Sequence, residues 1–558
     1  MARKKFACDF ETTTDPMDCR VWAYGVKELY SKTGVMIGKD IDEFMEFVMN
    51  INADLYFHNL KFDGSFIVNW LLKKGYRHDP DGLPGTFSTL ISDMGQWYMV
   101  DIVVGYKGKK KIHTVIYDSL KKLPFPIKTI AGMFNLEVQK GDIDYHKNRP
   151  VGYTPDKEEI SYIENDVEIL AQALEIQLDQ GLKKMTAGSD AIYDYKDIIT
   201  QKRFDKLYPK LPLEVDKNIR KAYRGGFTYL SDRFADKEIG DGIVFDVNSM
   251  YPGTMVNKEL PIGKPLYFEG EYEYDENYPL FIQRITCQFE LKKDHIPTIQ
   301  IKNNPLFRAT EYLKSSNHEV VELYVTNVDL KLMKEHYHLY ELKYYEGFKF
   351  RSSVGMFEDY IKKWMDVKEN TTGAMRTLAK LMLNSLYGKF ASNPDVTGKV
   401  PYLNDDNSLG FRMGEEEFKD PVYTAMGVFI TSWSRDQVIR TAQSVYDRFI
   451  YCDTDSIHLT GTDIPEELKD EIDPVKMGYW DFEQSYFRGK YIRQKTYMYE
   501  YMKDGEVKTK VVCAGMPDVV KDKVTFDNFK KGFSESGKLL PKQVDGGVVL
   551  VDTEFTLK

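Results

Sequence analysis

The sequence predicts a multidomain chain in which α/β and α+β architecture follow one another. Its 558 residues exceed what a single hydrophobic core organises, so three or more domains or subdomains are expected. Strand and helix patterns alternate over residues 1–185, residues 258–355 are rich in β-forming residues and turns, and residues 357–390 are strongly helical. No internal repeat or low-complexity tract connects these regions.

The first region is predicted to be a mixed sheet flanked by helices. In FACDFE, Phe6, Cys8 and Phe10 alternate with acidic residues, as expected for a half-buried strand. Further strands are expected at ADLYFHN, WYMVDIVVGY and KIHTVIYDS, and helices at KFDGSFIVNWLLKKG and over 154–181. The long second helix is expected to begin at a Thr154 cap and to end at Gly181.

The later elements are predicted from local signals. The pattern loosens over residues 186–230, and GIVFDVNSMYP is expected to be a strand that breaks at Pro252. The helical region is expected to end near Gly388, because glycine suits a C-terminal cap. YCDTDS is predicted to form a tight turn between two strands, and residues 528–558 a small β-rich appendix.

Composition narrows the class of protein. The formal net charge of −10 counts mildly against a nucleic-acid binder, although binding depends on local stripes such as YKGKKK rather than on the total. The five cysteines are widely spaced and form no C-x-x-C pair, which indicates a reducing compartment without structural zinc or disulfides. Since no apolar run approaches the ~18 residues of a membrane span, we expect a soluble, cytoplasmic protein with no membrane partner.

Four carboxylates in the first region have the spacing of a two-metal site. Asp9 and Glu11 project from one face of a strand, although such a pair alone is usually two ordinary exposed acids. HNLKFDG adds Asp63, and YIEND places Tyr162 one helical turn before Asp166. Mg²⁺ prefers oxygen ligands, and two ions about 4 Å apart can clamp the attacking and leaving oxygens of a phosphoryl transfer. Tyr162 is then placed to orient the attacking water.

A second set of carboxylates lies further along the chain. Asp246 ends a predicted strand, and Asp453 and Asp455 lie at a predicted hairpin tip. Aspartates also occur at such tips for reasons of turn geometry alone, so an isolated D-x-D-S motif is ambiguous. The signal becomes specific when the helix between these motifs is included.

A cationic stripe follows one face of that helix. Arg376, Lys380, Asn384 and Tyr387 fall at i, i+4, i+8 and i+11, with leucines on the opposite face. An amphipathic helix explains the leucines, but it does not explain cations that lead to an amide and an aromatic ring. A nucleoside triphosphate needs cations on its phosphates and an aromatic face on its base. Together the two clusters predict an enzyme that both makes and trims a phosphodiester chain.

The first set of motifs resembles the DEDD-type 3′-5′ exonucleases with an RNase H-like fold, in their tyrosine-containing form. The resemblance carries over Asp9, Glu11, Asp63 and Asp166 as metal ligands and, with Tyr162, as catalytic residues. It also implies a set that holds a single-stranded 3′ end: Thr12, His58, Asn59, Phe62, Ser119 and Leu120, with Lys140 near the scissile phosphate. These residues have local explanations as well, with Asn59 and Ser119 as caps and Phe62 in the core.

The second set of motifs, D-x-x-S-x-Y-P, K-x-x-x-N-S-x-Y-G and Y-x-D-T-D-S, resembles the polymerase motifs of family B DNA polymerases. Lys495 and Tyr497 in RQKTY add the K-x-Y element that steadies a primer in that family. HNLKFDG, YRGGF and YCDTDSIHLTGT extend the resemblance, essentially end to end, to the protein-primed polymerases of small Bacillus phages, of the phi-29 type. Two departures are Arg376, where a lysine is expected, and a shortened stretch after Tyr497.

The resemblance implies a fold and a domain order. An RNase H-like 3′-5′ exonuclease domain is followed by a right-hand polymerase of palm, fingers and thumb with two insertions. The implied boundaries are 1–186 for the exonuclease, 187–257 for the first part of the palm, 258–355 for insertion 1, 356–391 for the fingers, 392–423 for the palm return and insertion 2, 424–527 for the palm with the catalytic hairpin and K-x-Y element, and 528–558 for the thumb.

The resemblance also assigns roles in synthesis. Asp246 and Asp455 are expected to hold two Mg²⁺ ions, for which Mn²⁺ is expected to substitute, with Asp453 in support. Lys380 is a further expected catalytic residue. The implied nucleotide-binding residues are Tyr251, Lys368, Arg376, Lys380, Asn384, Tyr387 and Gly388. The implied DNA-binding residues of this half are Tyr223, Gly225, Gly226, Lys495 and Tyr497.

The implied partners are template-primer DNA, a displaced single strand, dNTPs, and a terminal protein whose side-chain hydroxyl primes synthesis. We expect a processive, strand-displacing monomer in the cytoplasm of a bacterial host during phage infection. Three rival functions remain: a 3′-5′ exonuclease with a non-synthetic nucleic-acid-binding half, a polymerase with inactive proofreading, and a structural nucleic-acid-binding protein. The complete sets of acidic residues favour the enzyme with two activities.

Overall fold

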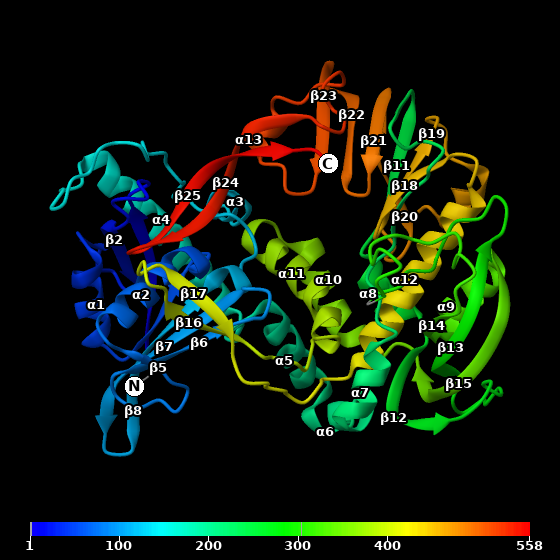
Figure 1. Cartoon of the computed structure of the whole chain (residues 1–558), viewed down its shortest axis with the longest axis horizontal. Coiled ribbons are helices and arrows are strands. Elements are labelled where there is room, and N and C mark those ends of the chain that lie inside the picture. The colour runs from blue at the N-terminus through cyan, green and yellow to red at the C-terminus, as the bar shows by residue number, and fades with distance from the viewer. Residues whose placement is uncertain (1–2, 303) are drawn as a thin grey trace.

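The computed structural model describes residues 3–302 and 304–558, and its first half is built on an eight-stranded sheet (Figure 1). The strand order is β3-β2-β1-β4-β8-β7-β6-β5. The strands are β1 (Lys4–Thr12), β2 (Val21–Glu28), β3 (Met36–Gly38), β4 (Ala53–Phe57), β5 (Arg77–His78), β6 (Thr86–Ile91), β7 (Trp97–Lys107) and β8 (Lys110–Asp118). Because β1 runs parallel to β4 and antiparallel to β2, the predicted mixed sheet is confirmed.

The helices of this half are α1 (Ile41–Met49), α2 (Leu60–Lys73), α3 (Ile127–Met133) and α4 (Lys157–Asp179). The predicted Thr154 cap of α4 is wrong, because Asp156 is the N-cap residue. The Asp156 side chain accepts bonds from the backbone N–H groups of Glu158 and Glu159, and the Glu159 side chain accepts from the N–H of Asp156. This capping box fixes the start of α4, which packs against β1 and β2.

Three short helices link the two halves where the sequence pattern loosens: α5 (Ala187–Ile199), α6 (Gln201–Leu207) and α7 (Leu213–Arg220). Thr186 caps α5 and Thr200 caps α6, each through a side-chain oxygen that accepts a backbone N–H three residues later. α5 packs against α11 (Gly373–Phe390). The connecting region is therefore part of the core of the second half.

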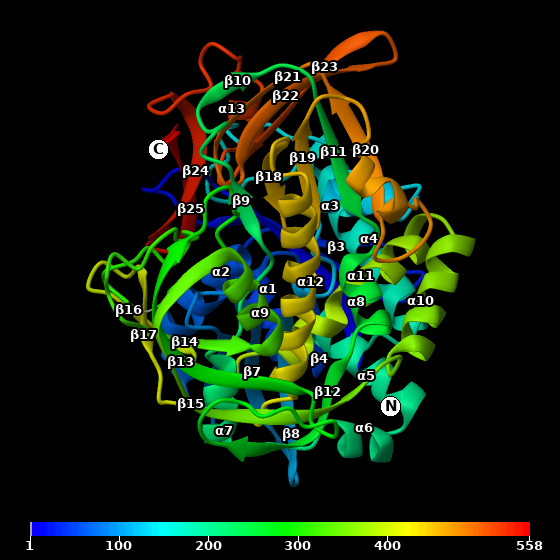
Figure 2. The same ribbon diagram turned by 90° about the vertical axis from the view of Figure 1, so that its right-hand side faces the viewer.

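The second half is built on a five-stranded antiparallel sheet in the order β20-β11-β19-β18-β9. Its strands are β9 (Thr228–Leu230), β11 (Gly242–Val247), β18 (Phe449–Asp453), β19 (Ser456–Thr460) and β20 (Trp480–Tyr486). α12 (Thr424–Ser444) packs against β18 and β19 (Figure 2). The predicted strand break at Pro252 is wrong, because β11 ends earlier and Pro252 lies in the first turn of α8 (Met250–Asn257), where proline is tolerated.

Residues 258–355 contain a separate four-stranded sheet in the order β12-β15-β13-β14, which confirms the β-rich prediction. Its strands are β12 (Leu260–Phe268), β13 (Leu280–Leu291), β14 (Val321–Thr326) and β15 (Tyr337–Ser353). The periodicity did not indicate α9 (Asn327–His336), which Thr326 caps through the N–H of Asp329. α9 packs against α12, so this sheet is joined to the second half by a helix pair.

The helical region forms two helices, α10 (Glu358–Asn370) and α11, separated at residues 371–372. The predicted cap at Gly388 is wrong, because α11 continues to Phe390. The Phe390 ring is fully buried and packs edge-on against Phe357 at 5.7 Å, so tertiary packing extends the last turn. Among the described residues, no helix is long and apolar enough to cross a membrane.

The remaining elements are hairpins and a small sheet. They are β16 (Lys399–Leu403) with β17 (Leu409–Met413), the sheet β10 (Lys237–Ile239)-β21 (Arg488–Arg493)-β22 (Thr496–Lys503)-β23 (Glu506–Cys513), α13 (Asp518–Lys521), and β24 (Ser534–Val544) with β25 (Gly547–Thr556). The shortened stretch after Tyr497 is the β22–β23 hairpin. Asp504 and Gly505 close it with φ angles of 54° and 80°, as a two-residue turn between strands requires.

The C-terminal hairpin β24–β25 reaches across to the first half of the molecule (Figure 1). Val548 and Val549 share a buried core with Phe66 of α2. The Gln543 amide donates a hydrogen bond of 3.1 Å to Ser65 Oγ. A Cβ on Gly547 would collide with the Phe66 ring, so glycine is required for this approach. The C-terminal hairpin therefore packs on α2 in the first half of the molecule.

Candidate active sites

The first acidic cluster is brought together by three elements. Asp9 and Glu11 lie on β1, Asp63 lies in the first turn of α2, and Asp166 lies on α4. Glu11 is 6% exposed, and Asp63 and Asp166 are 4% exposed. The structure thus places all four predicted carboxylates in one buried neighbourhood.

Burial, and then the charges of neighbouring carboxylates, make ionisation of these carboxyls unfavourable. Burial, followed by the charge of Asp166, raises the pKa of Asp9 to about 7. Burial and the neighbouring charges of Asp9 and Asp166 hold the pKa of Glu11 well above its ordinary value. Burial and Asp9 do the same to the pKa of Asp63. A cation among these oxygens would stabilise the charged form of every member.

Lys140 supplies a positive charge at the edge of the cluster. Its ammonium forms an ion pair with Asp166 and lies 4.9 Å from the centre of the Tyr162 ring. Burial alone would lower the pKa of Lys140, but Asp166 outweighs it, and the pKa lies above its ordinary value. The hydroxyls of Tyr162 and Tyr145 share a hydrogen bond of 2.7 Å. Tyr145 was not predicted, because only this contact distinguishes it from other tyrosines.

The donors of the first cluster fit magnesium. All are carboxylate oxygens, the ligand type that Mg²⁺ prefers, and Oδ1 of Asp166 is buried without a hydrogen-bond partner among the described residues. Within residues 3–302 and 304–558, no three His, Cys, Asp or Glu side chains converge closely enough to enclose a metal ion. The four carboxylates are therefore neighbours, but no three of them are close enough together to coordinate a single ion.

Several residues predicted to hold a single strand lie next to the carboxylates in the sequence, with Thr12 after Glu11 and Phe62 before Asp63. The two ring nitrogens of His58 contact Ser119 Oγ at 3.0 Å and Phe125 O at 2.8 Å. Asn59 is exposed and has a φ of 71° at the start of α2, but its side chain makes no capping bond. The residue that caps the turn at 119–121 is Asp118. The local explanations of Asn59 and Ser119 as capping side chains are therefore wrong.

The other predicted strand contacts are half-buried. They are Thr12, Phe62 and Leu120. The Phe62 ring lies 5.7 Å from that of Phe66, so one side of it packs against the core. A partly exposed apolar side chain beside the carboxylates is suited to a base or a sugar, and the DNA-binding role of these residues stays a prediction.

The second acidic cluster lies at the end of the five-stranded sheet. Asp246 on β11 is opposite Ser456 on β19, and the N–H of Val247 donates to the carbonyl of Asp455 at 2.7 Å. Thr454 has a φ of 63° and makes the tight turn that YCDTDS predicts. Asp246 and Asp455 both line a cleft of about 600 Å³. Burial, and then the charge of Asp455, raises the pKa of Asp246 to about 7.

Asp453 is held in a different way from its two neighbours. The Lys495 ammonium contacts its carboxylate oxygens at 2.7 and 2.8 Å. Thr228 Oγ1 donates to it at 3.0 Å and the Tyr451 hydroxyl at 3.2 Å. The Tyr497 ring is 8% exposed and lies 5.2 Å from that of Tyr451. The K-x-Y element thus touches the predicted catalytic hairpin, β18–β19, through Asp453.

The opposite wall of the cleft is cationic. Lys368 of α10 and Lys380 and Asn384 of α11 line it. Lys368 Nζ donates to Ser249 Oγ at 3.1 Å, and Arg376 donates to the carbonyl of Lys368 at 2.6 Å. Burial, followed by the charges of Lys380 and Arg376, lowers the pKa of Lys368. A bound anion would relieve that repulsion.

Two tyrosines form an aromatic floor beside this wall. Tyr251 of α8 and Tyr387 of α11 stack with ring centres 4.0 Å apart and planes at 22°. Tyr251 lines the cleft. Gly388 is exposed, and a Cβ on it would meet no described atom within 4 Å. Of the predicted nucleotide-binding residues, Tyr251, Lys368, Lys380 and Asn384 line the cleft. The other three, Arg376, Tyr387 and Gly388, lie on α11 outside its lining.

The YRGGF loop, residues 223–227, lies against the tip of the catalytic hairpin. A Cβ on Gly226 would come within 2.7 Å of Thr454 Cγ2, so this position requires glycine. Tyr223 is half-buried and Gly225 is exposed. The structure brings this loop to the second cluster, which the sequence alone could not establish.

Two acidic residues of the cleft were missed in the sequence. Asp481 and Glu483 of β20 line it, and their charges contribute to the raised pKa of Asp246. They lie two apart in WDFEQ, a spacing that places both on one face of a strand. Their relevance depends on the pairing of β20 with β11, which joins distant segments of the chain.

Comparisons with known proteins agree with this geometry. The family of DNA polymerases type B, organellar and viral, matches residues 45–474. The DNA polymerase of Bacillus phage M2 is 62% identical over 572 aligned positions that cover 100% of both chains. Phi29 DNA polymerase complexed with primer-template DNA and incoming nucleotide substrates matches with a TM-score of 0.97 and 59% identity, and its complex with single-stranded DNA with 0.96 and 58%, both over 100% of each chain. This chain belongs to the family B DNA polymerases, in the group of phi29-type polymerases from Bacillus phages.

Proposed function

We propose that this polymerase copies a DNA template and also removes nucleotides from the 3′ end, with Mg²⁺ in both sites. The cleft in which Asp246 and Asp455 face Lys368 and Lys380 is the main support, because it combines metal-binding oxygens with cations for a triphosphate. The solved phi29 polymerase complexes hold primer-template DNA, incoming nucleotides or single-stranded DNA, and we extend those ligands to this chain.

In synthesis, Asp246 and Asp455 would hold two ions and Asp453 would support them. Bound Mg²⁺ lowers the pKa of the attacking hydroxyl and neutralises charge on the triphosphate. Lys368 and Lys380 would bind the phosphates and stay beside the leaving pyrophosphate.

The aromatic floor would select the sugar. Tyr251, stacked on Tyr387, would lie under the deoxyribose, where a 2′-hydroxyl would collide with the ring. Asn384 and Gly388 lie on the same helix as Tyr387 and would complete the nucleotide site. The exposed Arg376 would add charge near the phosphates through its contact with Lys368.

In trimming, Asp9, Glu11, Asp63 and Asp166 would hold the ions of the second reaction. Tyr162 would orient the attacking water, with its hydroxyl fixed by Tyr145. Lys140 would exchange its contact with Asp166 for one with the scissile phosphate. The half-buried residues Thr12, His58, Phe62 and Leu120, with the exposed Asn59 and the buried Ser119, would hold the frayed 3′ end.

We further propose protein-primed initiation, processive strand displacement and action as a monomer in the cytoplasm of the phage-infected host. Support comes from the two additional units: the β12–β15 sheet with α9 and the β16–β17 hairpin correspond in position to the two expected insertions. The terminal protein would supply a serine, threonine or tyrosine hydroxyl in place of the primer end.

Replication of a primed single-stranded circle with Mg²⁺ and dNTPs tests the synthetic proposal. We expect product much longer than one circumference, which needs extension, processivity and strand displacement together. Trimming of the primer without any extension would instead favour the alternative function, a 3′-5′ exonuclease with a non-synthetic half. Binding without turnover in either direction would favour a structural nucleic-acid-binding protein.

A further inference from the structure

The position of the catalytic hairpin depends on the YRGGF loop. The N–H of Thr454 at the hairpin tip donates to the carbonyl of Phe227 at 2.7 Å. Gly226 lies directly against the Thr454 side chain, and Thr228 just after the loop donates to Asp453 at 3.0 Å. A shift of the loop would therefore move the hairpin tip.

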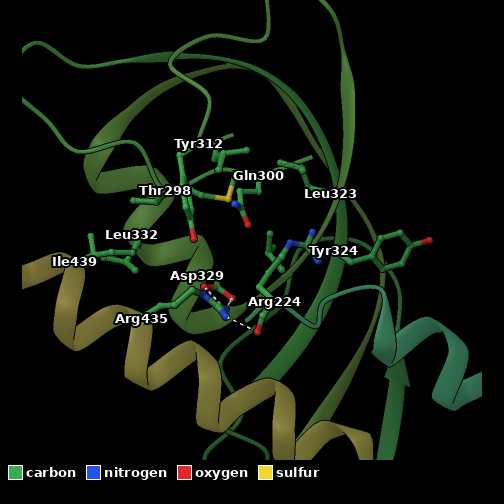
Figure 3. Close-up of a pocket in the computed structure, with 13 residues that line it drawn as sticks. Arg224, Thr298, Gln300, Tyr312, Leu323, Tyr324, Asp329, Leu332, Arg435 and Ile439 are labelled. Atoms are coloured by element: carbon green, nitrogen blue, oxygen red, sulfur yellow. Dashed lines mark hydrogen bonds and ion pairs between the residues drawn. The ribbon is translucent and has the colours of Figure 1, made fainter. Parts of the chain in front are cut away.

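A buried arginine forms hydrogen bonds with the backbone of this loop. Arg435 of α12 is 4% exposed, and its Nη1 donates to the carbonyls of Arg224 and Gly225 at 2.9 and 3.0 Å. Its Nη2 donates to both carboxylate oxygens of Asp329 at 2.9 Å and to Ser432 Oγ at 3.0 Å. Figure 3 shows the Arg435 side chain between Asp329 and Arg224. One guanidinium thus joins a carboxylate on α9 to two consecutive backbone carbonyls of the loop.

Asp329, the carboxylate partner of Arg435, is itself held in place by hydrogen bonds. Thr326 Oγ1 and Ser432 Oγ donate to Asp329 at 3.0 and 2.9 Å. Burial alone would raise the pKa of Asp329, but the charge of Arg435 and these bonds outweigh it and hold the pKa below its ordinary value. Tyr312 packs edge-on against Phe227 at 4.5 Å, so the β12–β15 unit supports the loop from a second side.

A simpler explanation is that Arg435 only pins α9 to α12. The chain provides a comparison, because Arg440 of α12 contacts Glu335 of α9 at 2.9 Å. Arg440 is 41% exposed at its side chain, and its contacts are with the carboxylates of Glu335 and Asp436. The same two helices are thus joined twice, and the contact with the loop carbonyls belongs to Arg435.

We propose that Arg435 is a positioning residue for nucleotide addition, which holds the YRGGF loop so that the hairpin presents Asp455 and Asp453 correctly. This inference rests on the proposed polymerase function. Arg435 acts through the loop backbone, without contact with substrate. Lysine at this position would keep the charge but lose the planar fork, which alone reaches a carboxylate and two carbonyls together.

Arg435→Lys and Arg440→Lys form a matched pair for the test. Single-nucleotide addition is measured as kcat and KM for the dNTP, trimming of single-stranded DNA is measured in parallel, and thermal unfolding gives Tm. For Arg435→Lys we expect kcat of addition to fall about 10- to 100-fold, because a displacement near 1 Å costs that much. KM for the dNTP and the trimming rate should stay within about twofold, and Arg440→Lys should resemble wild type in all three.

Equal effects of the two substitutions on kcat, or a parallel loss of addition and trimming, would overturn the proposal and leave Arg435 as a stabilising residue. If Arg435→Lys does not fold, Asp329→Asn is compared with Glu335→Gln in the same assays, with a selective fall in kcat again expected for the first alone. A wild-type protein that adds no nucleotide would refute the proposed function itself, which is a separate outcome.

Discussion

Both acidic clusters bring several carboxylates close together, but in different surroundings. In the first, Glu11, Asp63 and Asp166 are almost completely buried, and Lys140 is already paired with one of them. In the second, Asp246 and Asp455 line an open cleft of about 600 Å³. Both surroundings raise the pKa of a central aspartate, Asp9 or Asp246, to about 7.

The placement of positive charge distinguishes the two clusters. Lys140 lies at the edge of the first cluster and pairs with Asp166, so that site is partly neutralised. Under the proposed function, it would accept a strand end with a single scissile phosphate. Lys368 and Lys380 line the second cleft together with the acidic pair, and burial, followed by the like charges of Lys380 and Arg376, lowers the pKa of Lys368. Under the proposed function, a triphosphate would fill the space between its walls. The two placements of positive charge are thus consistent with the two proposed substrates.

Asp455→Asn should separate the two activities most strongly. Loss of a carboxylate proposed to hold Mg²⁺ would remove several kcal/mol of transition-state stabilisation, so extension should fall roughly 10³-fold or more. Trimming should stay within about twofold, because the first cluster contributes all of its own ligands. Gel electrophoresis of a labelled primer with and without dNTPs measures both activities. An equal fall in both would show that the clusters are not independent.

Asp9→Ala combined with Asp63→Ala should have the converse effect. Trimming should fall roughly 10²- to 10³-fold while extension is retained, because two of the four proposed metal ligands are lost. Glu28→Ala on the neighbouring strand β2 is a suitable control, since its carboxylate pairs with Lys4 at the surface. Trimming that persists in the double variant would mean that other residues hold the ions.

Lys380→Gln should produce the smallest of these effects and tests the cationic wall. We expect KM for the dNTP to rise about tenfold, equivalent to one charge-assisted hydrogen bond, with trimming unchanged. Lys362→Gln on the exposed side of α10 is the control. A KM that does not change would remove Lys380 from the phosphate site.

Much of both clusters could be predicted because local periodicity places the side chains. Alternation in FACDFE put Asp9 and Glu11 on one face of β1, and YIEND put Tyr162 beside Asp166 on α4. The tight turn at Thr454 followed from the D-T-D spacing. These signals span only a few residues, so no tertiary information was needed.

The features that the sequence did not predict depend on competition between local signals or on contacts between residues far apart in the sequence. Thr154 and Asp156 are both good cap residues, and the structure uses Asp156, whose side chain accepts from the N–H of Glu159 while its own N–H donates to the Glu159 side chain. α11 passes through Gly388 because Phe390 is buried in the core beyond it. Arg435 lies in an unremarkable helical stretch, and its loop partners are 210 and 211 residues away. No local pattern encodes such a contact.

The packing of the C-terminal hairpin on α2 has a consequence for biosynthesis. Ser65 is synthesised 478 residues before Gln543, its hydrogen-bond partner. At ordinary elongation rates, the face of α2 that carries Phe66 lacks the C-terminal hairpin for roughly 25–95 s. The nascent N-terminal unit must fold and remain soluble through that interval, and the completed enzyme is assembled only when its last strands emerge.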